Sequence, residues 1–291
     1  MAVASFDRLC TGITDEAGGL AKALSAVELD HPSPTCPGWT AGQLIGHLHQ
    51  ALSWAAGLVE TRAVAFVPPA NAAAGAGTGD ADWTDAVDDL ARRALDGFTG
   101  GDDREALSAW LLGAADRLAD ALRDAGPDGP VWTTFGPHRA GFWARWGALE
   151  AAVHRADAEL LAGREFGPDF GLDPELSYDS VGLWLTALGD PATEPFYDPR
   201  VVNLRGSGET LLFQVVDAPS GEVGRWLVTR TPEGPRTAVA PAEGTAADVT
   251  VRGDAAALLL VLKGRIPSTT PEVTVTGDAA LLDHWLANAL A

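Results

Sequence analysis

Apolar positions recur at helical spacing through the first 165 residues, and the spacing changes to that of strands further along the chain. Side chains three or four residues apart lie on one face of a helix, so this pattern predicts helices with one buried stripe each. The predicted helices cover residues 5–29, 40–64, 84–95, 103–125, 140–161 and 173–188. We therefore expect residues 1–165 to form a bundle of antiparallel helices.

Beyond residue 166 the chain is expected to pass through a helix and a proline-rich linker that ends near residue 199. From Val201 the apolar period falls to two, which is typical of half-buried strands. Strands are predicted over 201–205, 210–216, 225–230, 236–240, 247–252 and 273–275, and helices over 255–263 and 279–290. The expected fold class is α+β, with residues 200–291 forming a small α+β domain in which helices cover one face of an antiparallel sheet.

Length and charge narrow the function classes. The chain has 291 residues, which is enough for two domains, and a formal net charge of −20 at pH 7. A field of this sign repels polyanions, so we expect neither nucleic acid nor an anionic membrane surface as a partner. No stretch reaches the roughly 18–20 uninterrupted apolar residues of a membrane span, and residues 1–9 do not read as a leader. We expect a cytoplasmic monomer or homodimer.

The two cysteines, Cys10 and Cys36, form neither a disulfide framework nor a thiolate motif for a metal. Cys36 precedes Pro37 near a predicted helix start, where an activated thiol is one alternative. A small buried side chain is the interpretation that we favour, because unpaired cysteines are among the most buried residues.

Candidate chemistry is concentrated in residues 143–157, where Glu150 and His154 stand four residues apart in a helical sequence. Side chains at this spacing share one helix face, with Cβ atoms about 5–6 Å apart. Because the surrounding face is apolar, the carboxylate and the imidazole each need a partner that offsets their desolvation. Two alternatives remain open: the pair is a hydrogen bond within the core, or it holds a metal ion.

Residues 36–50 offer a third ligand. Thr40 and Gln43 form a capping-box pattern that starts a helix. On that helix one of His47 and His49 points inward while the other faces water, and His47 falls within the apolar stripe. Two histidines and one carboxylate from two helices make a ligand set typical of open zinc sites, which keep a position for water or substrate.

The sequence resembles the mycothiol-dependent maleylpyruvate isomerase family of actinobacteria over nearly its whole length. The matching motifs lie at 36–40, 46–48, 150, 153–157, 248–253, 258–265 and 275–278. The resemblance implies a DinB-like four-helix bundle followed by a sterol-carrier-like domain. It also implies that His47, Glu150 and His154 bind zinc or another divalent metal, and that Arg265 meets an acidic substrate. A helix-capping role is the alternative for Arg265.

The function that this resemblance implies is a zinc-containing cis-trans isomerase that uses mycothiol as its thiol cosubstrate. The thiolate adds to a conjugated double bond of a small, electrophilic and anionic acceptor; rotation and elimination then give the trans product. The alternatives are a mycothiol S-transferase in detoxification or natural-product metabolism, and a non-catalytic metal-containing binding or regulatory protein. Extra residues relative to the family, at 68–83 and 191–197, leave the identity of the acceptor open.

Overall fold

The computed structural model describes residues 4–69, 89–90, 93–101, 103–196, 198–219, 224–240 and 244–289. The chain divides into two compact units, an N-terminal unit of residues 4–170 and a C-terminal unit built mainly from residues 171–291. The helix expected over 84–95 falls largely outside the described residues.

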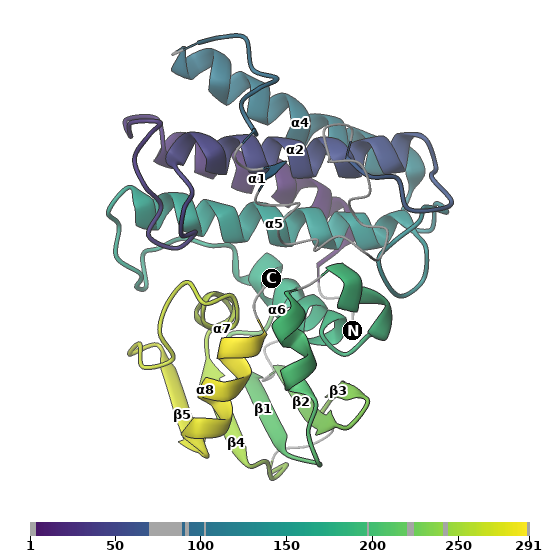
Figure 1. Cartoon of the computed structure of the whole chain (residues 1–291), viewed down its shortest axis with the longest axis vertical. Helices are drawn as coiled ribbons and strands as arrows, with labels where there is room; N and C mark the ends of the chain where they lie inside the picture. The colour runs from purple at the N-terminus through teal and green to yellow at the C-terminus, as the bar shows by residue number, and fades with distance from the viewer. Residues whose placement is uncertain are drawn as a thin grey trace. The chain divides into compact units, whose positions relative to one another are not determined.

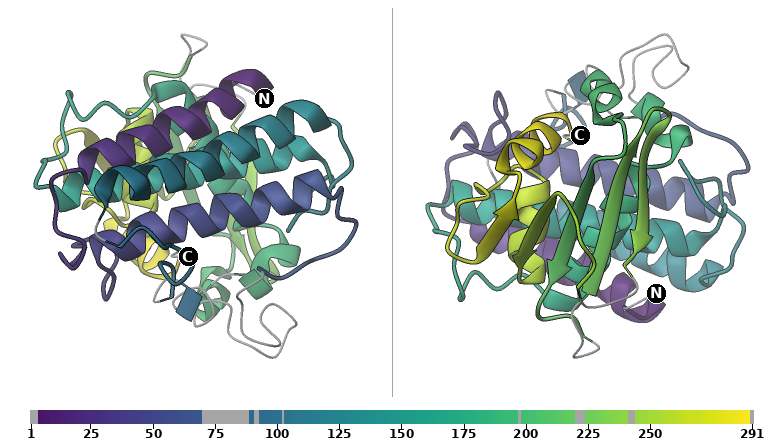
Figure 2. Two further views of the ribbon diagram at one scale, coloured as in Figure 1. Left: turned by 90° about the horizontal axis from the view of Figure 1, so that it is seen from above. Right: turned by 90° about the horizontal axis from the view of Figure 1, so that it is seen from below.

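The N-terminal unit is a bundle of long helices that lie side by side (Figures 1 and 2). These helices are α1 (Phe6–Ala23), α2 (Ala41–Glu60), α4 (Arg104–Ala125) and α5 (Ala140–Leu161). Ser5, Thr40 and Asp103 cap the first three helices by accepting hydrogen bonds from backbone N–H groups in the first turn. Such caps satisfy donors that have no partner within the helix. The predicted helical bundle is confirmed.

Helices α1 and α5 approach each other closely at Gly19. A Cβ atom at this position would lie 2.6 Å from both Cδ and Nε of Arg155, on α5. The Arg155 guanidinium donates through Nη1 to Oε2 of Glu16, on α1, over 2.9 Å, and Glu16 is only 2% exposed. The missing side chain of Gly19 therefore makes room for a part-buried ion pair between two helices.

The C-terminal unit is a five-stranded sheet with the strand order β3-β2-β1-β4-β5, packed with helices. Its strands are β1 (Thr210–Val215), β2 (Gly224–Thr231), β3 (Gly234–Val239), β4 (Val249–Gly253) and β5 (Val273–Gly277). The helices are α6 (Pro174–Ala187), α7 (Ala255–Leu262) and α8 (Ala279–Asn288). The view from below in Figure 2 shows the strands side by side. The α+β fold class is confirmed.

The expectation of a wholly antiparallel sheet is wrong for one strand pair. β1 and β4 run parallel, with Leu211 opposite Val249 and Phe213 opposite Val251, whereas the other neighbours are antiparallel. A short turn joins β2 to β3, which pair antiparallel. β4 follows β3 along the chain but pairs with the other edge of β1, so the β2–β3 hairpin lies in sequence between the two parallel strands and supplies the long crossover that a parallel pair requires.

The strand predicted over 201–205 is also wrong, because residues 201–204 belong to a 3₁₀ helix, η2 (Pro199–Leu204), which follows η1 (Pro191–Phe196), and Arg205 is its C-cap. Pro199 has its φ angle fixed near the helical value, and Asp198 accepts a hydrogen bond from the Arg200 N–H over 2.8 Å. Arg230, 9% exposed, then donates to the carbonyl oxygens of residues 203–205 and holds the end of η2 against β2.

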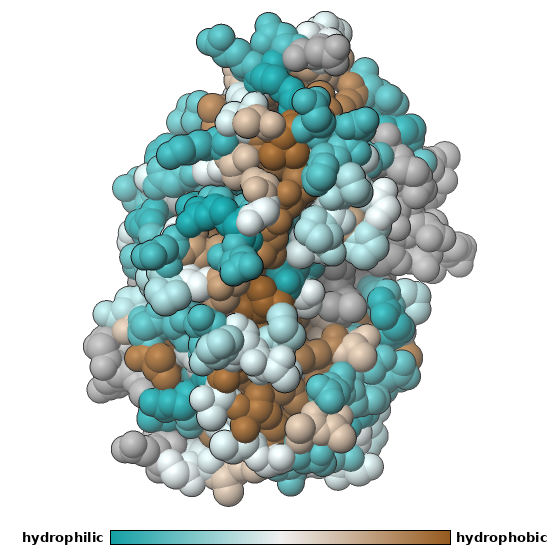
Figure 3. Space-filling model, turned by 90° about the vertical axis from the view of Figure 1, so that its left-hand side faces the viewer, coloured by the Kyte–Doolittle hydropathy of each residue, from teal (hydrophilic) through white to brown (hydrophobic). Residues whose placement is uncertain are grey.

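On the face shown in Figure 3 hydrophilic residues predominate, and hydrophobic residues form patches between them. Among the described residues, the exposed large hydrophobic side chains are all valines, at positions 64, 67, 202, 216 and 239. Across the described ranges, no helix combines the length and the apolar character needed to cross a membrane.

Candidate metal centre

His47 on α2 and the pair Glu150 and His154 on α5 come together within the N-terminal unit. Nε2 of His154 lies 3.5 Å from Oε2 of Glu150, and Nε2 of His47 lies 3.9 Å from the same oxygen. The two imidazole ring centres are 4.8 Å apart. One potential ligand atom from each of the three residues lies within 4.8 Å of the other two.

These separations can be compared with the two alternatives left open by the sequence, a core hydrogen bond and a shared metal ion. Good hydrogen bonds between nitrogen and oxygen span about 2.7–3.2 Å, which is shorter than either distance to Glu150. A tetrahedral zinc ion with bonds of about 2.0–2.1 Å would instead hold its ligand atoms about 3.3–3.5 Å apart. The 3.5 Å separation of His154 from Glu150 matches that of two ligand atoms on one zinc ion, whereas the 3.9 Å separation of His47 is longer than either arrangement requires.

The electrostatics of two of the three side chains, His47 and Glu150, suit a cation. The exposed fractions are 14% for His47, 19% for Glu150 and 8% for His154. Burial lowers the pKa of His47, and Glu150 offsets this only in part, so the imidazole is neutral and able to bind a metal. Burial alone would raise the pKa of Glu150, but the two neighbouring imidazoles outweigh it and hold the pKa below its usual range.

His154 differs from His47 because it has further polar neighbours. Burial alone would lower the pKa of His154, but Asp157, Cys36 and Glu150 together hold it well above the ordinary value. A metal ion binds only the unprotonated nitrogen of an imidazole, so metal binding at His154 would displace a proton from Nε2.

The loop before α2 adds an aromatic wall. The ring of Trp39 lies 4.7 Å from that of His47 and 6.3 Å from that of His154, measured between ring centres. Gly38 has a φ angle of 87°, a value that residues with a side chain rarely adopt, and it turns the chain into this position. The half-buried indole thus covers one side of both candidate ligands.

Asp157 is a residue of this site to which the sequence analysis assigns no role. It is 0% exposed and accepts hydrogen bonds from Nδ1 of His154 over 2.9 Å, from Oγ1 of Thr35 over 2.6 Å and from Sγ of Cys36 over 3.3 Å. Its spacing of three residues from His154 is a local signal that the two share a helix face. Cys36 is buried as expected, but its thiol also takes part in this polar network.

His49 does not belong to the ligand set, but the expectation that it faces water is wrong. Its ring is half-buried and stacks on Trp110, with ring centres 3.5 Å apart. Burial, aided by the positive charge of Arg117, lowers the pKa of His49 to about 4. The helical periodicity did not show that α4 presents an aromatic side chain to this face of α2.

Arg265 lies in the C-terminal unit, just beyond the end of α7. Its Nη1 donates to the carbonyl oxygen of Lys263, the C-cap residue of α7, over 2.7 Å. This contact is the one that the helix-capping alternative predicts. A role for Arg265 toward a substrate stays a prediction.

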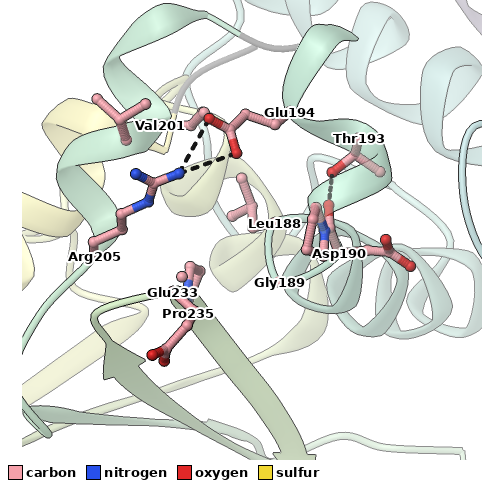
Figure 4. Close-up of a pocket in the computed structure, with 12 residues that line it drawn as sticks. Leu188, Gly189, Asp190, Thr193, Glu194, Val201, Arg205, Glu233 and Pro235 are labelled. Atoms are coloured by element: carbon pink, nitrogen blue, oxygen red, sulfur yellow. Dashed lines mark hydrogen bonds and ion pairs between the residues drawn. The ribbon is translucent and has the colours of Figure 1, made fainter.

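A cavity in the C-terminal unit is a poor candidate for the site. It lies beside η1, η2 and the turn between β2 and β3, and Arg205 at its rim is paired with both carboxylate oxygens of Glu194 at 3.3 Å (Figure 4). Its volume of about 30 Å³ is far below the roughly 300–1,000 Å³ of ordinary ligand pockets. None of its lining residues belongs to the proposed ligand set.

Comparison with known proteins identifies two domain families. Residues 10–159 match the mycothiol maleylpyruvate isomerase N-terminal domain, and residues 185–284 match the MDMPI C-terminal domain. No curated protein sequence matches the chain.

Two crystal structures share the fold over 95% of both chains. The mycothiol-dependent maleylpyruvate isomerase superimposes with a TM-score of 0.54 at 17% identity. A histidine-to-alanine mutant of an enzyme of that name superimposes with a TM-score of 0.56 at 16% identity. At such identities the likeness shows a common fold.

Proposed function

Because the chain belongs to the mycothiol maleylpyruvate isomerase family, we propose that it is a metal- and thiol-dependent enzyme that activates mycothiol for addition to a small unsaturated or electrophilic molecule. The observation that carries this proposal is the convergence of His47, Glu150 and His154 from two helices. We propose that these three residues hold zinc or another divalent ion. The cis-trans isomerisation of an anionic acceptor is the reaction that the family membership favours.

The ligand set suits thiol activation because of its charge. Two neutral imidazoles and one carboxylate leave a formal charge of +1 on a divalent ion, and three protein ligands leave a coordination position open. An ion held there favours the thiolate form of a bound thiol over the thiol itself. The half-buried ring of Trp39 limits the access of water to the two imidazoles.

In the isomerase reaction the thiolate forms a carbon–sulfur bond with one end of a conjugated double bond. The former double bond then rotates, and elimination of the thiolate restores it in the trans form, so the thiol is not consumed. A mycothiol S-transferase needs the same activated thiol but leaves it attached to the electrophile. The resemblance also supports Arg265 as the partner of an anionic acceptor.

Metal content tests the ligand assignment. Elemental analysis of the purified chain is expected to find about one divalent ion per molecule, and the double variant His47→Ala plus His154→Ala is expected to lose it. His49→Ala is the matched control, because His49 lies on the same helix and outside the ligand set. Metal that persists undiminished in the double variant would overturn the assignment.

Turnover separates the candidate functions. The metal-loaded protein is supplied with mycothiol and either maleylpyruvate or a bromobimane electrophile, and free thiol is measured along with product. Recovery of the thiol with a trans product identifies the isomerase, and consumption of the thiol into a conjugate identifies the transferase. If wild type and Glu150→Ala are equally inactive although the wild type binds metal and mycothiol, the non-catalytic alternative replaces this proposal.

A further inference from the structure

We propose that Asp157 is a positioning residue that sets the orientation of His154 through Nδ1, and that Thr35 and Cys36 hold Asp157 in place for this task. The inference rests on the proposed function, because it concerns how the same ligand set is supported. It adds to that set a buried carboxylate and two residues from a loop that is remote in the sequence.

Asp157 accepts hydrogen bonds from three neighbouring side chains, and these contacts show where the proton of each neighbour lies. Oδ2 contacts Nδ1 of His154 and Sγ of Cys36, and Oδ1 contacts Oγ1 of Thr35. An ionised carboxylate can only accept hydrogen bonds, so all three neighbours donate to it. With 0% of its surface exposed, Asp157 depends on these donors to offset the cost of burying its charge.

This arrangement leaves one nitrogen of His154 for a metal. Because Nδ1 carries a proton directed at Asp157, the lone pair available for coordination is that of Nε2. Nε2 is the atom that lies 3.5 Å from Oε2 of Glu150. Asp157 therefore selects the tautomer and limits ring rotation, and a carboxylate in this position also makes an imidazole a stronger metal ligand.

The same carboxylate fixes the loop that precedes α2. Thr35 and Cys36 belong to this loop, and the Cys36 carbonyl oxygen accepts a hydrogen bond from the Trp39 N–H over 3.0 Å. The Trp39 carbonyl oxygen accepts one from the Ser33 N–H over 2.8 Å. The loop is thus a compact turn whose position relative to α5 depends on Asp157. Asp157 therefore both orients His154 and holds the loop that carries Trp39.

Cys36, His154 and Asp157 also bring potential ligand atoms within 4.8 Å of one another, which raises the alternative of a second metal set. The hydrogen bonds favour the positioning role. Sγ of Cys36 and Nδ1 of His154 both contact Oδ2 of Asp157. A metal ion bound to these atoms would require Nδ1 of His154 to lose the proton that it shares with Asp157.

The affinity of the full chain for Zn²⁺ tests the inference, measured by competition with a chromophoric chelator. Asp157→Asn keeps the shape of the side chain but removes the charge, and it is expected to raise Kd by about tenfold to a hundredfold. Glu159→Gln is the matched control: Glu159 is a buried carboxylate on the same helix that pairs with Arg164. This control is expected to leave Kd unchanged.

A spectroscopic measurement distinguishes positioning from general support of the fold. In the metal-free wild type, at a pH at which the His154 imidazole is neutral, long-range proton–nitrogen NMR spectra are expected to show its proton on Nδ1. In metal-free Asp157→Asn at the same pH, the signals of both tautomers are expected. The cobalt-substituted wild type is expected to lack the intense near-ultraviolet band of a cysteine thiolate ligand. Such a band would overturn the inference in favour of the second metal set.

Each remaining outcome is decisive. Equal Kd values for wild type and Asp157→Asn overturn the inference while leaving the proposed function in place, whereas a wild type that binds no Zn²⁺ overturns both. If Asp157→Asn does not fold, Thr35→Val carries the test, because it removes one donor and leaves Asp157 and His154 intact. A smaller rise in Kd is expected there, and an unchanged Kd in that folded variant refutes the inference.

Discussion

Two adjacent glycines in α1, Gly18 and Gly19, are expected to respond in opposite directions to the same substitution. Replacing glycine by alanine inside a helix usually stabilises a protein by about 0.5–1 kcal/mol, because glycine loses more conformational freedom on folding. A Cβ atom at position 18 would meet the side chain of Leu112 at 3.9 Å, an ordinary contact. Gly18→Ala should therefore raise the free energy of unfolding by that amount.

At position 19 the new methyl group would lie 2.6 Å from two atoms of Arg155, so the arginine side chain must move. Its guanidinium is held by Glu16 at 2.9 Å, and Glu16 is 2% exposed. Removing one partner of a fully buried ion pair costs about 3–5 kcal/mol. Here both partners remain and the Arg155 side chain is 18% exposed, so displacing the guanidinium costs less. After subtraction of a helix gain of about 1 kcal/mol, Gly19→Ala should lower the free energy of unfolding by about 1–2 kcal/mol.

Equilibrium unfolding in urea, followed by far-ultraviolet circular dichroism, measures both effects. A chelator in the buffer removes any contribution of metal binding to stability. In an Arg155→Ala background the clash is absent, so Gly19→Ala should become as stabilising as Gly18→Ala. If Gly19→Ala stabilises the wild-type chain to the same extent as Gly18→Ala, the reasoning is refuted.

Arg230→Ala should lower the stability of the C-terminal unit by about 3 kcal/mol, because the carbonyl oxygens of residues 203–205 lose a buried charged donor. Urea unfolding measures this loss, and Arg236→Ala, at an exposed arginine, is the control. Burial raises the pKa of Asp254, so the folded state loses stability as pH rises from the ordinary carboxyl pKa through the raised one. Asp254→Asn keeps the helix cap without the buried charge, so it should melt at a higher temperature than the wild type at neutral pH. If the difference in melting temperature between the two proteins widens on acidification, this reasoning is contradicted. Burial raises the pKa of Cys10 to about 11, so at mildly alkaline pH its thiol should react with a chromogenic disulfide reagent far more slowly in the folded chain than in urea. Equal rates would show that the thiol is accessible.

Local patterns were enough to predict the elements that carry the candidate ligands. Thr40 and Gln43 lie three residues apart, and the reciprocal hydrogen bonds that start α2 form between them at 2.9 and 3.4 Å. Glu150 and His154 share a face of α5 for the same reason, since helical periodicity operates over a few residues. Sequence reasoning therefore reached the three residues that converge, although their binding of a metal stays a proposal.

Features that depend on distant parts of the chain were missed. Thr35 and Asp157 are 122 positions apart, so their hydrogen bond leaves no periodic trace in the sequence. The parallel pairing of β1 and β4 has the same origin, because hairpin signals specify only strands that follow each other directly. The wrong strand prediction at 201–205 has a local cause. Asp198 and Pro199 are helix-start signals, but the apolar residues that follow them also fit the pattern of a strand.

The central position of β1 determines when the sheet can be completed during synthesis of the chain. β1 pairs with β2 on one side and with β4 on the other, and the residues of β4 leave the ribosome after β1, β2 and β3 have all emerged. Until then the nascent meander presents a row of unsatisfied backbone groups, which is a template for pairing with another chain. Fragments that stop short of Val249 would keep this open edge permanently, and we expect them to aggregate where the full-length chain does not.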